Sequence, residues 1–315
     1  MRVVVLAGGT GGAKLAAGLQ AELPAGDLTV VVNTGDDTER HGLLVMPDHD
    51  AVLYMLAGTF DFERGWGVAG ETWTVMDALA GLGEAAWFRL GDRDFATHIA
   101  RHSRLAGGAR LTTAVRSLQV AAGIPTTILP MTDVPVRTEV RTDDGWLDFQ
   151  EYFVHRQQVP DVHEVRFAGI DAARPTGDVI EALASADVVI IGPSNPLVSI
   201  APILAVPGMR SALADARSRG TPTVAVSPIV GGKALKGPAD RMLSSLGFES
   251  SALGVARLYA DMVDAIVIDT VDVALAGSIE ALGLRVVATD TIMAGEAGRA
   301  RVARSVLEAA SAAGA

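Results

Sequence analysis

Short apolar runs, rich in valine and isoleucine, recur along the chain and predict the strands of a buried sheet. Runs of this length with little polar alternation are typical of parallel strands that are covered on both faces. The predicted strands are Arg2–Leu6, Leu28–Asn33, Thr126–Leu129, Val188–Gly192, Thr223–Ser227, Ala265–Asp269 and Arg285–Ala288.

Helical periodicity separates most of these runs, and the alternation predicts an α/β fold, a doubly wound, Rossmann-like and mostly parallel sheet. The helical stretches are Ala13–Glu22, Gly177–Ala184, Met209–Ser218, Ala239–Leu246, Val255–Met262 and Glu296–Ala312.

The alternation breaks in the middle of the chain, where three helical stretches precede a hairpin turned at Asp143-Asp144-Gly145. We therefore expect residues 1–59 and 172–315 to form a nucleotide-binding core, and residues 60–171 an inserted, mainly helical cap that holds substrate. Four tryptophans in this region could stack a flat ring or anchor a small core, and the sequence leaves both open. The helical stretches are Thr72–Leu82, Asp94–Leu105 and Leu111–Ala122, and the tryptophans are Trp66, Trp73, Trp87 and Trp146.

A glycine-rich loop follows the first strand and precedes the first helix. Such a loop offers backbone N–H groups and the positive end of a helix dipole to an anion, so we predict a phosphate or diphosphate site. The spacing matches neither G-x-G-x-x-G nor the P-loop, so neither a standard dinucleotide site nor a standard P-loop follows. The predicted phosphate-binding residues here are Gly8, Gly9, Thr10, Gly11, Gly12 and Lys14.

Four aspartates, Asp36, Asp37, Asp48 and Asp50, follow the second strand at the sheet edge where open α/β folds bind ligands. Carboxylates beside a phosphate loop suit Mg²⁺, and we predict Asp37, Asp48 and Asp50 as metal-binding and catalytic residues. The alternative is structural, with Asp36 or Asp37 forming an Asx turn and Asp50 capping a helix over Ala51–Leu56.

Two later loops add polar groups that suit a nucleotide. The first is predicted to read the base or sugar and the second to bind phosphate, although a solvated loop is the alternative for the second. The residues are Pro193, Ser194, Asn195 and Ser199 in the first loop, and Gly231, Gly232 and Lys233, with Lys236 behind them, in the second.

Composition excludes several classes of protein. A net charge of −11 without a basic stretch argues against nucleic acid, and the absence of cysteine excludes disulfides, thiolate catalysis and iron–sulfur clusters. Neither an export signal nor an uncharged run of membrane-spanning length is visible, so we expect a cytoplasmic protein with no membrane partner. His98 and His102 lack the HExxH context of a zinc site and are read as polar contacts.

Several motifs together resemble the CofD/FbiA family of coenzyme F-420 biosynthesis, and the likeness is strongest to its mycobacterial members. They are LAGGTGGAKLAAGL, NTGDD, HGL, PDHD, LGDRDFATHIAR, LPMTD, IIGPSNPLVSI and SPIVGGKALKGPAD. The resemblance implies a transferase that moves a phosphoenolpyruvyl or 2-phospho-L-lactyl group from a guanosine-diphosphate-linked three-carbon acid to the ribityl hydroxyl of the deazaflavin Fo, releasing GMP. It also implies Mg²⁺ and a homodimer. For the deazaflavin we predict Trp66, Trp87, Gly91, Asp92, Thr132 and Asp133.

Two rival functions remain at this stage. A nucleotide-sugar-binding regulator of the gluconeogenesis factor type would share GGTG and the fold but would need no deazaflavin pocket. An NAD(P) oxidoreductase would share the fold but not the dinucleotide fingerprint.

Overall fold

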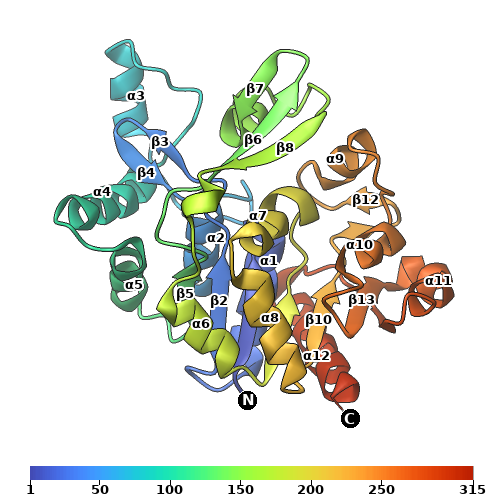
Figure 1. Ribbon diagram of the computed structural model, residues 1–315. Helices are drawn as coiled ribbons and strands as arrows, with labels where there is room; N and C mark the ends of the chain where they lie inside the picture. Colours follow the sequence, from blue (N-terminus) through green and yellow to red (C-terminus); the bar gives the residue numbers. More distant parts are fainter. Residues whose placement is uncertain (315) are drawn as a thin grey trace.

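The computed structural model describes residues 1–314 and is built on one sheet of seven parallel strands (Figure 1). All seven predicted strands are confirmed, and no end differs by more than one residue. The strand order is β14-β13-β10-β9-β1-β2-β5, so the chain winds outward from β1 in both directions. The bounds are β1 Val3–Ala7, β2 Leu28–Val32, β5 Thr127–Pro130, β9 Val188–Ile191, β10 Thr223–Val226, β13 Ala265–Asp269 and β14 Arg285–Thr289.

Alternate side chains of each strand enter two separate hydrophobic cores, because successive residues of a strand point to opposite faces. Val3 and Val5 pack beneath α1 (Gly9–Glu22), α2 (Pro47–Leu56) and α12 (Gly295–Ala313). Val4 and Leu6 pack on the other face. The helices there are α6 Gly177–Ala184, α8 Met209–Ser218, α10 Ala252–Tyr259 and α11 Ala276–Glu280. The doubly wound α/β prediction is therefore confirmed.

The insertion between β2 and β9 contains more strand than the sequence indicates. The predicted hairpin is present, with Thr142 paired to Gly145 across a two-residue turn. An unpredicted third strand, β8, pairs with β6, and a short β3–β4 hairpin precedes α2. β5 falls within residues 60–171 of the sequence, but in the structure it is an edge strand of the main sheet. The bounds are α3 Thr74–Gly81, α4 Asp92–Ala106, α5 Leu111–Ala121, β3 Thr38–Arg40, β4 Leu43–Val45, β6 Arg137–Thr142, β7 Gly145–Asp148 and β8 Glu164–Ala168.

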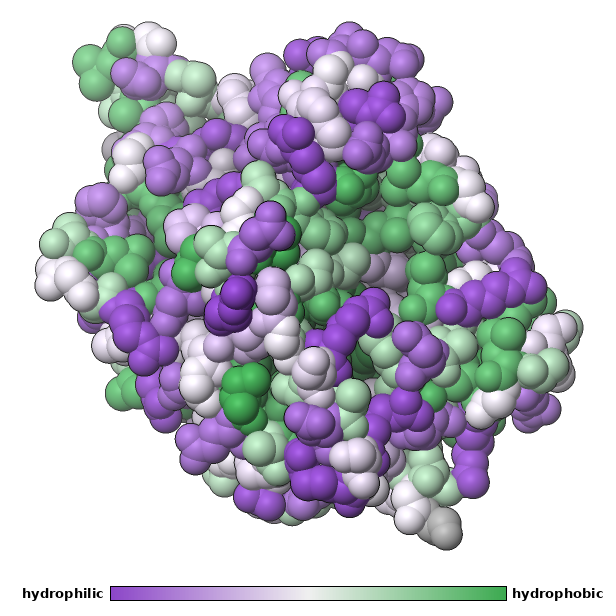
Figure 2. Space-filling model, in the orientation of Figure 1, coloured by the Kyte–Doolittle hydropathy of each residue, from purple (hydrophilic) through white to green (hydrophobic). Residues whose placement is uncertain are grey.

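The remaining elements are short. A π-helical turn over Pro196–Ile200 leads into α7 (Ala201–Ala205) after β9, and a small hairpin with α9 follows β10. In Figure 2, apolar residues gather on the visible face near β8, α7 and α10, where a cavity of about 270 Å³ lies. The bounds are β11 Ile229–Val230, β12 Lys233–Ala234 and α9 Ala239–Ser245.

No helix within residues 1–314 is by itself long and apolar enough to cross a membrane. The helical pair Pro196–Ala205 and Met209–Ser218 reaches the required length and composition only jointly, and it is bent by 82°.

Candidate active site

A cavity of about 620 Å³ lies at the carboxyl ends of β1 and β9. These two strands are neighbours in the sheet. From this pair the strand order proceeds toward one edge of the sheet through β2 and β5, and toward the other edge through β10, β13 and β14. Open α/β folds bind ligands at such a switch point. The predicted residues in the cavity lining are Gly8, Gly9, Thr10, Gly11, Lys14, Asp48, Asp50, Trp66, Trp87, Pro193, Ser194, Asn195 and Ser199.

The glycine loop is held tightly against the loop after β9. The Ser194 hydroxyl donates to the carbonyl of Gly8 at 2.7 Å and accepts from its N–H at 3.0 Å. A Cβ on Gly11 would lie 2.1 Å from the Pro193 carbonyl oxygen, and one on Gly12 would lie 2.7 Å from the Ser194 hydroxyl. Glycine is therefore required at both positions for close backbone approach. This packing keeps the N-terminus of α1 at the cavity wall.

Three buried aspartates crowd together beside this loop. Asp48 accepts from the Gly9 N–H at 2.6 Å, while the Asn33 amide donates to both Asp48 and Asp36. Burial raises the pKa of Asp48 to about 6, although these hydrogen bonds oppose the shift. Burial and then the Asp48 charge raise the pKa of Asp36 well above its ordinary value. A cation among these groups would relieve both effects.

Asp37 belongs to the same acidic cluster but stands behind the cavity lining. It is 2% exposed, and one of its carboxylate oxygens has no hydrogen-bond partner among the described residues. Burial raises the pKa of Asp37 well above its ordinary value, although Arg137 and Arg101 oppose the shift. Carboxylate oxygens are ligands that Mg²⁺ prefers, but those of Asp36, Asp37 and Asp48 do not all lie within 4.8 Å of one another in residues 1–314, so the three side chains would have to move together around the ion.

Asp50 differs because a buried arginine, Arg101, already neutralises it. The Arg101 guanidinium donates to Asp50 and to the Leu44 carbonyl, and the arginine is fully buried. Burial alone would raise the pKa of Asp50, but Arg101 holds it well below its ordinary range. Asp50 is also not an N-cap, because α2 begins at Pro47 and places it inside the first turn. The helix-capping alternative for this residue is therefore wrong.

Possible ligand atoms of Asp50, Asp94 and His98 lie within 4.8 Å of one another. The Arg101 charge already occupies this group, and it opposes the entry of a divalent cation. We therefore place the metal hypothesis on the Asp36, Asp37 and Asp48 cluster.

Two lysines bring positive charge to the cavity. The Lys236 ammonium donates to the Thr10 hydroxyl at 3.3 Å and to the Gly65 carbonyl, while Lys14 lies nearby on α1. Burial lowers the pKa of both lysines, and the charge of Lys14 lowers that of Lys236 further. Neither forms an ion pair with a carboxylate in residues 1–314. The predicted Lys233 is exposed and does not reach the cavity.

Aromatic side chains form a large part of the cavity lining, which we call its aromatic end. Trp87 stacks on His155 with ring centroids 4.7 Å apart, and the Arg40 guanidinium lies 4.6 Å from its ring centre. Trp66 packs edge to face against Trp73. The aromatic residues in the lining are Tyr54, Phe60, Trp66, Trp87, Phe88, Phe149 and Phe153.

The other predicted residues lie outside the cavity lining and hold loops in place. Asp92 accepts from the Thr72 hydroxyl at 2.5 Å, and Asp133 accepts from the Thr112 N–H and hydroxyl. A Cβ on Gly91 would lie 2.1 Å from the Glu71 carboxyl carbon. The predicted residues outside the lining are Gly12, Asp37, Gly91, Asp92, Thr132, Asp133, Gly231, Gly232 and Lys233.

Comparison with known proteins shows the family of this chain. Residues 3–307 match the family described as 2-phospho-L-lactate transferase CofD. A phosphoenolpyruvate transferase of Streptomyces griseus is 43% identical over 98% of both chains. A 2-phospho-L-lactate transferase of Methanosarcina acetivorans is 41% identical over 92% of this chain and 93% of its own.

Solved structures share the fold. A member of the UPF0052 family from Bacillus halodurans superposes with a TM-score of 0.65 over 97% of this chain and 98% of its own, at 17% identity. The sequence matches go further than this fold likeness. The chain therefore belongs to the CofD family and is a transferase of the phosphoenolpyruvate or 2-phospho-L-lactate class.

Proposed function

We propose that this enzyme transfers a phosphoenolpyruvyl group from a guanosine-diphosphate-linked donor to the ribityl hydroxyl of the deazaflavin Fo, releasing GMP and forming dehydro-F-420-0. The 2-phospho-L-lactyl donor, which would give F-420-0, is the alternative. The observation that carries the proposal is a single cavity that joins two lysines without carboxylate partners, buried aspartates and an aromatic end.

The donor would lie along the glycine loop. Its diphosphate would meet the first N–H groups of α1 together with Lys14 and Lys236, and their charges would be balanced by phosphate oxygens. Asn195 and Ser199 would face the guanosine from the loop after β9. The Asn195 side-chain oxygen accepts from the Leu197 N–H at 2.9 Å, which fixes the orientation of its amide.

The reaction is a displacement at phosphorus. The hydroxyl oxygen forms a bond to the phosphorus that carries the three-carbon acid, the bond from that phosphorus to the GMP oxygen breaks, and one of the buried aspartates would take the hydroxyl proton. Asp36, Asp37 and Asp48 would hold Mg²⁺, which when bound supplies positive charge to the phosphate oxygens. The backbone N–H groups and lysines stabilise the remaining charge from fixed positions, and they need no reorganisation as the charge develops.

The acceptor would lie at the aromatic end. A flat tricyclic ring suits a wall of aromatic side chains, and a volume of about 620 Å³ falls in the range of ordinary ligand pockets. Trp66 extends from the loop that Lys236 contacts through Gly65. Donor and acceptor would therefore meet where this loop approaches the glycine loop.

The test mixes purified protein, Mg²⁺ and Fo with freshly prepared enolpyruvyl- or lactyl-diphosphoguanosine in separate reactions. Chromatography with mass detection follows the deazaflavin and GMP. We expect stoichiometric GMP and a deazaflavin product whose mass increases by the phosphoenolpyruvyl group. No product with either donor, from folded protein that binds GDP, would contradict the proposal and favour the regulator hypothesis.

A further inference from the structure

Asp94 places an unused carboxylate oxygen in the cavity. The residue is 6% exposed and lines the cavity from the first turn of α4. The Tyr54 hydroxyl donates to its Oδ1 at 2.6 Å, and His98 Nε2 lies 3.2 Å from the same oxygen. Oδ2 has no hydrogen-bond partner among residues 1–314, and it is not enclosed by protein.

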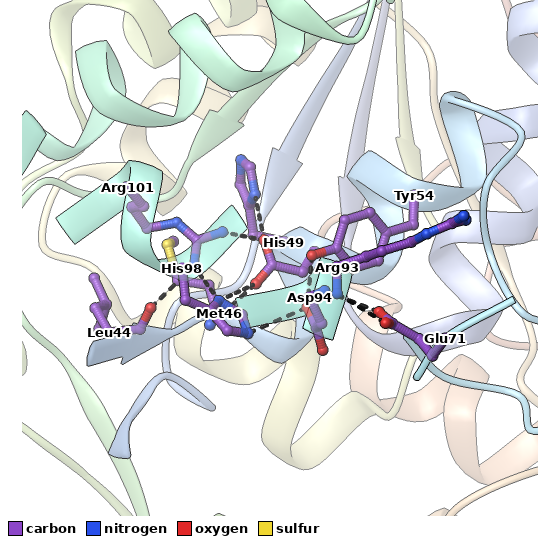
Figure 3. A network of polar contacts seen from close by, with 10 residues as sticks. Leu44, Met46, His49, Tyr54, Glu71, Arg93, Asp94, His98 and Arg101 are labelled. Atoms are coloured by element: carbon purple, nitrogen blue, oxygen red, sulfur yellow. Dashed lines mark hydrogen bonds and ion pairs between the residues drawn. The ribbon is translucent and has the colours of Figure 1, made fainter. Parts of the chain in front are cut away.

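The surrounding residues hold this carboxylate in one orientation (Figure 3). The Glu71 carboxylate accepts from the backbone N–H groups of Arg93 and Asp94, which anchors the start of α4. Burial raises the pKa of Tyr54 well above its ordinary value, as do the charges of Asp50 and Asp94, so the tyrosine remains a hydrogen-bond donor. The support is therefore rigid on the Oδ1 side.

Oδ2 lies next to the part of the cavity lining that contains Trp66 and Gly67. A methyl group built on Gly67 would lie 4.0 Å from Oδ2, and Gly67 follows Trp66 in the chain. A carboxylate oxygen accepts hydrogen bonds and donates none when ionised. The group that it can bind there is a hydroxyl or N–H of the molecule that occupies the aromatic end.

The other carboxylates of the cavity are already engaged. Asp50 is paired with Arg101, Asp48 accepts from Gly9 and Asn33, and Asp36 accepts from the same Asn33 amide beside the glycine loop. Asp94 is thus the carboxylate whose free oxygen is directed at the acceptor side. A cation is disfavoured next to Asp94, because the Arg101 charge lies against the same group.

We propose that Asp94 binds a hydroxyl of the acceptor's polyol side chain and thereby selects acceptors that carry one. The proposal rests on the proposed function, since it assumes a ring acceptor with a hydroxylated chain. Tyr54 and His98 act as positioning residues, because they contact Asp94 and hold its second oxygen toward the cavity.

The test combines a substitution with a change in the ligand. Two ligands are compared by calorimetry: Fo, and the same deazaflavin ring with a methyl group in place of the polyol. The affinity of each ligand is measured for wild type and for Asp94→Asn. A hydrogen bond to a charged group predicts that wild type loses ~10- to 100-fold in affinity when the polyol is removed. We expect Asp94→Asn to bind Fo weakly and to lose little further affinity.

Glu84→Gln is the matched control, because Glu84 is an exposed carboxylate of the same inserted region. It should reproduce the wild-type difference between the two ligands. GDP affinity should be unchanged in both variants. If Asp94→Asn fails to fold, Asp94→Glu keeps the carboxylate, displaces its oxygen, and should weaken Fo binding but not ring binding.

The outcomes separate the two proposals. Equal losses on polyol removal in wild type and Asp94→Asn would overturn the role of Asp94 while leaving the proposed function intact. Failure of folded, GDP-binding wild type to bind Fo would overturn the proposed function, and the role of Asp94 with it.

Discussion

Replacing the buried Arg101 with methionine is expected to destabilise the fold strongly through Asp50. The arginine is fully buried and Asp50 is 4% exposed, so the substitution leaves a largely buried carboxylate without its counter-charge. Removing one partner of such a pair typically costs ~3–5 kcal/mol. The entropy of unfolding is about 0.7 kcal/mol per kelvin for 315 residues, so the melting temperature should fall by about 4–8 °C.

Differential scanning calorimetry at pH 7.5 measures this shift. Arg104→Met is the control, because Arg104 lies on the same helix and the one hydrogen bond of its side chain within residues 1–314 is to the Ala100 carbonyl, at 2.7 Å. Its melting temperature should change by about 1 °C or less, as for an ordinary surface substitution. Adding Asp50→Asn to Arg101→Met should recover part of the loss. Equal shifts for Arg101→Met and Arg104→Met would refute the argument.

Three further predictions test the metal cluster, the lysines and the glycine loop. Because burial raises the pKa of Asp48 to about 6, its ionisation destabilises the metal-free fold as pH rises from about 4 through 6. Mg²⁺ should therefore raise the melting temperature more at pH 7.5 than at pH 5. Asp48→Asn should reduce that difference between the two pH values. An equal Mg²⁺ effect at both pH values would contradict this cluster as the metal site. Lys236→Ala should weaken GDP binding ~10-fold or more by calorimetry, whereas Lys233→Ala should not; equal effects would remove Lys236 from the anion site. Gly11→Ala should lower the denaturant midpoint sharply through its clash with the Pro193 carbonyl, whereas Gly81→Ala, with no atom near its Cβ, should not; equal midpoints would contradict the close approach.

The central sheet could be predicted from sequence because its strands are continuous apolar runs. β8 could not be predicted, because its residues Glu164–Ala168 alternate between exposed and partly buried positions and form no buried apolar run. This strand belongs to the small three-stranded sheet and not to the central one. The short β3–β4 hairpin carries even less pattern, with three residues in each strand. Pairing of such strands depends on contacts distant in sequence.

Whether a predicted site residue lies in the cavity lining could be foreseen where backbone geometry fixes its position, but not where the direction of a side chain decides. Loops after β1 and β9 must meet at the sheet edge, so their residues could be placed from the strand pattern alone. In contrast, Asp92 and Asp94 stand two positions apart on α4, and only the second reaches the cavity. Lys233 and Lys236 differ in the same way on one hairpin. The phase of the helix and the geometry of the turn determine which of the two side chains reaches the cavity, and neither can be read from a single sequence.

The central position of β1 has a consequence for synthesis on the ribosome. Val3 pairs with Val188, so the backbone groups along one edge of the first strand remain unpaired until a strand 185 residues later has been synthesised. At ordinary elongation rates of 5–20 residues per second this interval is roughly 10–40 s. During that time an apolar strand edge is open to wrong pairing, and the glycine loop lacks the wall that Ser194 supplies. The nascent chain therefore needs shielding until about three fifths of it has been made, and ligand binding can begin only after that point.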